Sequence, residues 1–155
     1  MKTTTLFAAF IAAATIAHAA DEPVKGMNKI PAAAAEGLKK YASDHSMKIE
    51  KVSTQKHGKA TVYEAELTAP GQPNHEVAVT ADGNVKGEEE TVPLEKVPEA
   101  ARKAIEAGAK GQKIARVQRI QEDGIVTYEA AYQNAKGKIT EVEYLEDGKP
   151  KPQAP

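Results

Sequence analysis

Two stretches of the chain carry apolar residues at the three- and four-residue spacing that marks one face of an amphipathic helix. Each stretch begins at a proline after an apolar residue, and proline favours a helix start because its missing N–H would have no partner there. We therefore expect one helix after Pro31 and a second after Pro98, the latter ended by Gly108 and Gly111. The apolar positions are Ile30, Ala34, Leu38 and Tyr41 in the first stretch and Val97, Ala101, Ala104 and Ile105 in the second.

Strand patterns follow each predicted helix. Apolar and polar residues alternate at 63–67, 77–79, 128–133 and 142–144, which is typical of an antiparallel sheet that is covered on one face. Asp-Gly pairs at 82–83, 123–124 and 147–148 indicate two-residue hairpin turns. Ile114, Val117 and Ile120 are three residues apart, a helical spacing. We interpret their segment as a bulged strand, because a hairpin turn follows it directly.

The pattern occurs twice in the same order. Tyr-Glu-Ala at 63–65 returns at 128–130, and the same offset of 65 relates Lys-Ile at 48–49 to 113–114 and Glu-Val at 76–77 to 141–142. We predict an α+β fold of two tandem repeats, each one helix packed on an antiparallel β-meander of three to four strands. The pattern leaves open whether the two sheets join into one. The predicted segments are a signal peptide at 1–19, an N-terminal segment at 20–29, a first repeat at 30–90, a connector at 91–96, a second repeat at 97–149 and a Pro-rich tail at 150–155.

The first residues have the order of a secretory signal peptide. Lys2 supplies a positive start, an uncharged apolar run covers 6–16, and Ala17 and Ala19 are small residues before a cleavage point. The run is too short to span a bilayer, which takes about 20 residues, so a retained anchor is the less favoured alternative. We expect a mature chain that begins near Ala20, has no membrane span and is periplasmic or secreted.

Composition narrows the possible functions. The chain has no cysteine, which excludes disulfides, thiolate metal sites and cysteine nucleophiles. Its formal net charge of −1 argues against nucleic acid as a partner, because nucleic-acid binding needs a basic patch. There is no tryptophan, and both phenylalanines lie in the predicted signal peptide. We therefore expect a thin, alanine-rich core of modest stability.

The repeated motifs resemble a known family. A proline-started, alanine-rich helix, then Lys-Ile-x-x-Val, Tyr-Glu-Ala, Glu-Val-x-Val/Tyr and Asp-Gly, resembles the PepSY-like domains of bacterial envelope proteins. These domains are related in fold to the repeat of the β-lactamase-inhibitor protein. The resemblance covers 30–90 and 97–149 and implies a secreted binding or inhibitory module without catalytic residues. The chain departs from the inhibitor in having neither its disulfides nor its binding surface rich in tryptophan and tyrosine, which argues against a β-lactamase as the target.

Catalytic motifs are missing from the sequence. None of the serines after residue 20 lies in a Gly-x-Ser-x-Gly elbow, and no glycine-rich phosphate loop is present. We expect no enzyme activity and no cofactor. The alternative is a small-ligand or metal-binding protein that uses His45, His57 and His75. These histidines lack a short ligand spacing, so exposed loop histidines are the preferred interpretation.

One surface remains as a candidate for binding. Alternation along the strands places a set of glutamates on the sheet face away from the helices, with Lys51 and two arginines available as cross-strand partners. The simplest interpretation is a solvated surface with salt bridges. The functional hypothesis is that this face, or a free edge strand, binds a basic or extended segment of an unidentified envelope protein or peptide. The candidate residues are Glu64, Glu66, Glu76, Glu129, Glu141, Glu143, Arg116 and Arg119.

Overall fold

A computed structural model describes residues 24–57 and 60–152 of the chain. The predicted signal peptide and its cleavage point near Ala20 lie outside these residues, as does the last part of the predicted tail. Within the described part of the chain, no helix is both long and apolar enough to cross a membrane.

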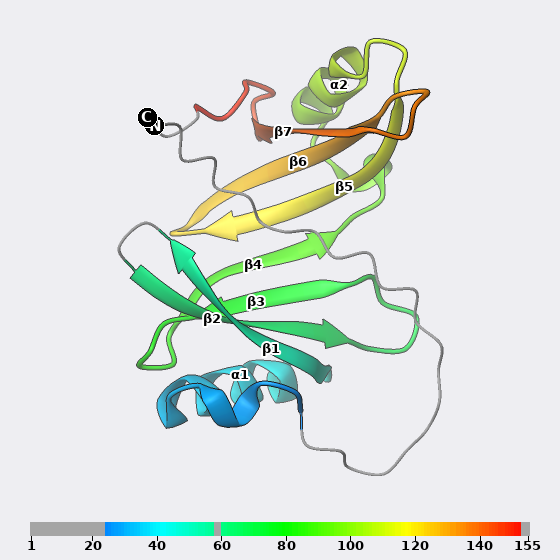
Figure 1. Cartoon of the computed structure of the whole chain (residues 1–155). Helices are drawn as coiled ribbons and strands as arrows, with labels where there is room; N and C mark the ends of the chain where they lie inside the picture. The colour runs from blue at the N-terminus through cyan, green and yellow to red at the C-terminus, as the bar shows by residue number, and fades with distance from the viewer. Residues whose placement is uncertain (1–23, 58–59, 153–155) are drawn as a thin grey trace.

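Seven antiparallel strands form a single sheet in which every strand pairs with its neighbours in chain order (Figure 1). One helix precedes the first four strands and another precedes the last three, so the predicted α+β class is confirmed. Short 3-10 turns lie before each helix, at Met27–Lys29 and Leu94–Lys96. The elements are α1 (Ala32–Asp44), β1 (Lys48–His57), β2 (Ala60–Thr68), β3 (His75–Val79), β4 (Val85–Thr91), α2 (Glu99–Gly108), β5 (Lys113–Glu122), β6 (Ile125–Gln133) and β7 (Ile139–Leu145).

The pairing of β4 with β5 decides the question that the sequence left open. Their ladder runs from Gly87 opposite Glu122 to Thr91 opposite Gln118, so the two groups of strands are one continuous sheet. Both helices cover the same face of this sheet, yet they lie at opposite ends of the molecule (Figure 1). The sheet therefore curves, and the face away from the helices is its concave face.

Two hydrophobic cores lie between the helices and the sheet. In the first, Leu38 of α1 packs on Leu67 and Val77, and in the second, Ile105 of α2 packs with Tyr132. Both helices start where the sequence predicts, because Pro31 and Pro98 stand at their N-caps. The first core contains Ala34, Leu38, Tyr41, Ala42, Ile49, Val52, Ala65, Leu67, Val77 and Val79, and the second contains Val97, Ala101, Ile105, Ala109, Val117, Tyr128, Ala130, Tyr132 and Tyr144.

β-bulges explain the apolar spacing of the first strand in each half. β1 shifts register between Ile49 and Lys51, and β5 shifts between Ile114 and Arg116. One extra residue lets two apolar side chains three positions apart face the same side of a sheet. The bulged strand predicted from Ile114 and Val117 is confirmed. Ile120 lies on the concave face instead, because no bulge separates it from Val117.

Close contacts between helix and turn fix the position of each helix. Gly83 has a φ of +86°, and a Cβ added there would lie 2.4 Å from the carbonyl oxygen of Ala33 in α1. At Gly148, where φ is +82°, an added Cβ would lie 2.6 Å from the carbonyl oxygen of Ala100 in α2. Only glycine combines this backbone conformation with so close an approach.

We expect Gly83→Ala to lower the free energy of unfolding by about 3 kcal/mol, because it adds a clash with α1 to the strain of a positive φ. Urea unfolding of the two variants measures this loss. Gly71→Ala is the matched control, since Gly71 has a φ of +73° and nothing within 4 Å of an added Cβ. The control isolates the strain and should lose only about 1 kcal/mol. Equal losses in both variants would show that the helix contact is unimportant.

Candidate functional site

The concave face carries a set of glutamates that come from six strands. Ala65 and Leu67 point into the first core, so Glu64 and Glu66 between and beside them face the other way. The register of the strands extends this face to β7. The six glutamates that the alternation predicted on one face all lie there, joined by two that were not predicted. The eight are Glu64, Glu66, Glu76, Glu89, Glu122, Glu129, Glu141 and Glu143.

Three of these glutamates form a row across neighbouring strands. Glu76 of β3 stands opposite Glu66 of β2 on one side and opposite Glu89 of β4 on the other. Like charges at directly opposite positions destabilise a sheet when both are ionised. Burial, a hydrogen bond with Glu64 and the charges of Glu64 and Glu66 raise the pKa of Glu76 to about 8, although Lys51 opposes the shift. Much of Glu76 is therefore protonated at neutral pH.

Glu89 is the most constrained member of the row. Its side chain is 7% exposed, and Gln118 Nε2 donates a hydrogen bond to its Oε1 atom. Among the described residues, Glu89 Oε2 and Gln118 Oε1 are buried without a hydrogen-bond partner. Burial, followed by the charge of Glu76, raises the pKa of Glu89 to about 8. These two buried oxygens without a hydrogen-bond partner make the Glu89–Gln118 pair the least satisfied point of the described concave face.

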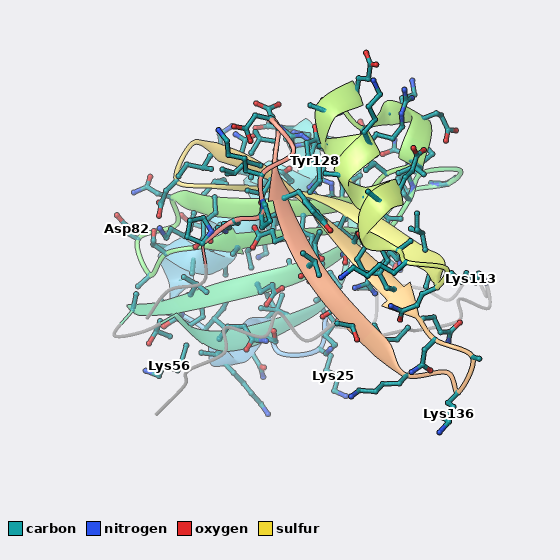
Figure 2. All side chains as sticks on the ribbon, turned by 90° about the horizontal axis from the view of Figure 1, so that it is seen from above. Lys25, Lys56, Asp82, Lys113, Tyr128 and Lys136 are labelled. Atoms are coloured by element: carbon teal, nitrogen blue, oxygen red, sulfur yellow. The ribbon has the colours of Figure 1, made fainter. Side chains whose placement is uncertain are left out.

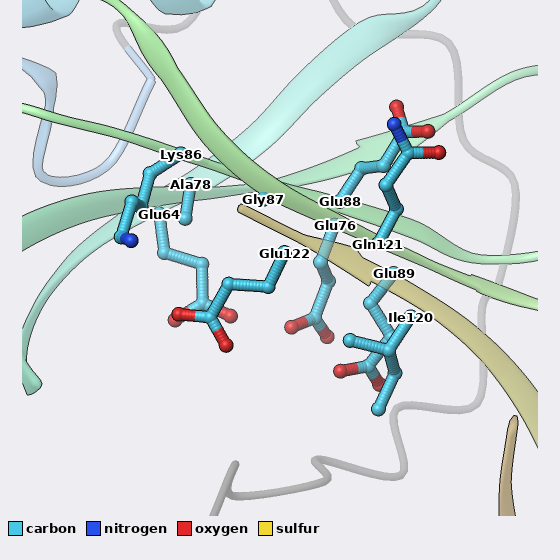
Figure 3. Close-up of a pocket in the computed structure, with 10 residues that line it drawn as sticks. All are labelled: Glu64, Glu76, Ala78, Lys86, Gly87, Glu88, Glu89, Ile120, Gln121 and Glu122. Atoms are coloured by element: carbon cyan, nitrogen blue, oxygen red, sulfur yellow. The ribbon is translucent and has the colours of Figure 1, made fainter. Parts of the chain in front are cut away.

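A shallow pocket lies beside Glu89. Ala78 and Gly87, which are cross-strand partners on β3 and β4, contribute no more than a methyl group to it. Figure 3 shows Glu64, Glu76, Glu89, Glu122 and Ile120 pointing to one side of the sheet, and Glu88 and Gln121 pointing to the other. Lys86 also lines the pocket, and its Nζ atom donates to Asp123 in the turn between β5 and β6. The pocket thus combines a small apolar floor with carboxyl groups from four strands.

The second half of the face has partners for its carboxylates. Arg116 Nη2 lies 3.0 Å from Glu141 and 3.6 Å from Glu129. Lys151 Nζ lies 2.7 Å from Glu143, and Thr127 donates to the same carboxylate. Burial and the charge of Glu141 nevertheless raise the pKa of Glu129 to about 7, although Arg116 opposes the shift. Across the described face, Lys51, Arg116 and Lys151 are the basic residues that form ion pairs with these glutamates.

The structure places Arg119 on the other face of the sheet, which corrects the expected grouping. Arg119 lies three residues after Arg116 without an intervening bulge, so the two side chains point to opposite faces. Its Nη1 atom is 3.3 Å from Glu88 and 3.9 Å from Glu90, on the side covered by the helices. Tyr41 of α1 donates a 2.6 Å hydrogen bond to Glu88. Burial works against ionisation of Glu88, but the hydrogen bonds from Tyr41 and Arg119 outweigh it and lower the pKa.

Two of the three candidate histidines meet at Tyr41. His45 stacks on its ring with centroids 4.0 Å apart, and His75 Nε2 lies 2.7 Å from its hydroxyl. His75 begins β3 and lies under α1; it is only 9% exposed, so the expectation that it is an exposed residue is wrong. Burial lowers the pKa of His75. His57 ends β1 opposite Ala60, and within 24–57 and 60–152 no three His, Asp or Glu side chains are grouped to hold a metal ion.

Sequence reasoning missed Glu89, Glu122 and Gln118. The predicted first repeat ends at residue 90 without an assigned face for the run 88–90, and the structure continues β4 through this run to Thr91. A run of three glutamates has no apolar alternation, so the period-two signal is absent there. Gln118 and Glu122 lie two and six residues after Arg116, so they share its face of the sheet. The sequence could have placed them there only by continuing the alternation of faces from Arg116 along the bulged strand. That extension requires the position of the bulge.

Neither a family model nor a curated protein matches the sequence. Solved structures do match in fold. A protein of Bacteroides eggerthii that is provisionally assigned to the periplasm has a TM-score of 0.63 and 17% identity over 81% of this chain and 88% of its own. A DUF2874-family protein of Bacteroides ovatus has a TM-score of 0.58 and 14% identity over 77% and 82%.

A third match is a BLIP-like protein of Bacteroides fragilis, that is, one similar to the β-lactamase-inhibitor protein. Its TM-score is 0.54 at 16% identity, over 87% of this chain and 88% of its own. Identities this low show a shared fold and nothing further. The chain therefore has a BLIP-like α+β fold, while membership of the PepSY-like family stays a prediction.

We expect the free energy of unfolding to fall as pH rises from about 5 to 8. Glu76 and Glu89 have folded-state pKa values of about 8, above the ordinary 4.5, so the folded protein binds more protons than the unfolded chain in this window. Glu89→Gln should raise stability at pH 8 by about 1–2 kcal/mol and change little at pH 4.5. Urea unfolding across pH measures both.

Glu99→Gln is the control for this pH series. Glu99 is 69% exposed in α2 and pairs with Lys103, so its replacement should leave the pH dependence unchanged. A Glu89→Gln variant with the same pH dependence as the wild-type chain would contradict the raised pKa of Glu89.

We expect Arg119→Met to lower the free energy of unfolding by about 1–2 kcal/mol, because it leaves two partly buried carboxylates without their cation. The double variant Glu88→Gln/Arg119→Met should recover part of this loss, since it removes one of the stranded charges. Thermal and urea unfolding of the single and double variants give the coupling energy. Strictly additive losses would contradict the ion pair.

Proposed function

We propose that the mature chain is a periplasmic, non-enzymatic protein-binding module whose concave face binds a basic segment of an envelope protein. The observation that carries this proposal is the excess of carboxyl groups on that face. Eight glutamates gather there, and three basic side chains of the described residues pair with them. A face with this charge pattern attracts a basic partner and disfavours acidic ones.

The edges of the sheet are less suited to binding than the face. The carbonyl oxygen of Lys25 accepts a 2.9 Å hydrogen bond from the N–H of Val52, on the outer side of β1. The N–H of Lys151 donates a 2.8 Å bond to the carbonyl of Glu143, on the outer side of β7. Segments from both ends of the described chain thus occupy part of each edge, which leaves less room for an added strand. We therefore favour binding on the concave face over addition of a partner strand at an edge of the sheet.

The fold comparison supports the location and the kind of partner. A structural neighbour is provisionally assigned to the periplasm, which agrees with the signal peptide predicted at 1–19. Another neighbour is BLIP-like, a name that refers to an inhibitor of another protein. Inhibition of an envelope hydrolase or protease is accordingly the first activity to assay for any partner that is found.

We also infer that the sheet arose from two copies of one helix-and-meander unit. The bulges in β1 and β5 lie 65 residues apart, as do Gly83 and Gly148. Each of these glycines meets a backbone carbonyl near the start of its helix, at Ala33 and Ala100. Equivalent irregularities at equivalent positions support duplication more strongly than repeated strands alone, because a bulge is not required by the general plan of a sheet.

The proposal is tested by capture on immobilised protein (residues 20–155) from an envelope extract, with elution in steps of salt. Replacement of Glu66, Glu141 and Glu143 by Gln should reduce capture of each salt-eluted partner by at least about tenfold, because it removes three of the eight carboxyl groups and takes a carboxylate partner from each of Lys51, Arg116 and Lys151. Quantitative mass spectrometry measures the reduction.

The matched control replaces Glu95, Glu99 and Glu106 by Gln. These three are exposed on α2 and the turn before it, so the change in net charge is the same but the concave face is intact. Capture should then stay within about twofold of the wild-type chain. Equal effects of the two triple variants, or capture that is insensitive to salt, would overturn the concave face as the binding surface.

A further inference from the structure

The pocket beside Glu89 lies at the joint between the two halves of the molecule. Its lining comes from β2 and β3, from β4, and across the joint from Ile120 and Glu122 of β5. Figure 3 shows the carboxyl groups of Glu64, Glu76, Glu89 and Glu122 on the same side of the sheet. Neither half alone would contain all of these groups.

The floor and the rim of the pocket differ in chemistry. Ala78 and Gly87 stand opposite each other on β3 and β4, so the floor is made of a methyl group and backbone. The glutamates stand around it, and Lys86 at the rim is bonded to Asp123. A ligand that fits both parts has a short apolar stem and a cationic head.

The unsatisfied acceptors indicate which head group fits. Glu89 lines the pocket and is more than nine-tenths buried; its Oε1 atom accepts from Gln118 Nε2, while its Oε2 atom lacks a hydrogen-bond partner among the described residues. A buried acceptor without a donor costs about 1–3 kcal/mol. A guanidinium group offers five N–H donors in a planar fork, which suits neighbouring oxygens better than the compact, strongly hydrated ammonium group of lysine.

We propose that this pocket binds one guanidinium group, the side chain of an arginine in the basic partner segment, with Glu89 as its principal acceptor. The inference rests on the proposed function and adds the residue class that the partner inserts. Glu76 and Glu64 supply further negative charge beside the head group, and Ala78 and Ile120 contact the stem.

Binding of a cation here is coupled to proton release. Glu122 of β5 lines the same pocket as Glu76 and Glu89. The charged groups that act on the pKa of Glu76 or Glu89 are Lys51 of β1, Glu64 and Glu66 of β2, Arg116 of β5, Glu129 of β6 and Glu141 of β7. Burial and these carboxylates raise the pKa of both Glu76 and Glu89 to about 8. A guanidinium favours the ionised carboxylates, so binding should strengthen as pH rises from about 6 to 8.5.

The test is a titration of isotope-labelled protein (residues 20–155) with the peptide acetyl-Gly-Arg-Gly-amide, followed by NMR amide shifts. We expect saturable binding at millimolar concentration, strengthened about tenfold between pH 6 and 8.5, with the largest shifts at Gly87, Glu89 and Gln118. The same peptide with citrulline, a neutral near-isostere of arginine, should bind at least about tenfold more weakly. The lysine peptide should bind at least about threefold more weakly than the arginine peptide.

Glu89→Gln should weaken binding of the arginine peptide at least about fivefold. The variant should fold, because the substitution removes a buried carboxyl group rather than a packed side chain. The Glu95→Gln/Glu99→Gln/Glu106→Gln variant, whose changes lie on α2 and the turn before it and outside the pocket, should stay within about threefold. Equal binding of arginine and citrulline peptides, equal binding of the lysine peptide, or no effect of Glu89→Gln would overturn the guanidinium site. Partner capture that fails in the Glu66→Gln/Glu141→Gln/Glu143→Gln variant but survives Glu89→Gln would leave the proposed function standing and reject the pocket.

Discussion

The ladder of backbone hydrogen bonds between β4 and β5 is the constraint on which the rest of this structure depends. It joins a helix with four strands to a helix with three strands and keeps both helices on one face. Because the joined sheet curves away from the helices, its far face becomes concave and its glutamates converge. The Arg119–Glu88 pair on one face and the pocket beside Glu89 on the other both cross this same joint.

Glu88 and Glu89, which lie on the two faces of the joint, differ in their hydrogen-bond partners and in the direction of their pKa shifts. On the helix-covered face, Glu88 receives hydrogen bonds from Tyr41 and Arg119, which lower its pKa. On the concave face, Glu89 keeps one unpartnered oxygen and a raised pKa. The first arrangement is what a structural ion pair requires. The second costs stability in the folded chain, which is a common property of sites that are completed by a ligand.

This contrast connects stability with function through the same carboxyl groups. Crowded carboxyls on the concave face oppose one another when ionised, and together with burial this repulsion raises the pKa of Glu76, Glu89 and Glu129. Under the proposed function, a basic partner would remove that repulsion and make ionisation favourable. Binding energy would then come partly from relief of the repulsion within the face itself. Such a face would select for positive charge and penalise neutral or acidic partners.

Local patterns in the sequence determined the elements of this protein. Prolines at 31 and 98 mark the helix starts, Asp-Gly pairs mark turns, and alternation places Glu64, Glu66 and Glu76 on one face, because these signals depend on neighbours a few residues apart. Only the tertiary structure decided that the two groups of strands pair through β4 and β5. That pairing extends β4 through Glu89 and places Arg119 within ion-pair distance of Glu88 and Glu90. It also forms the pocket on the concave face. The α1 packing likewise buried His75 against Tyr41. These features depend on contacts between residues about 30 or more positions apart, which no local period encodes.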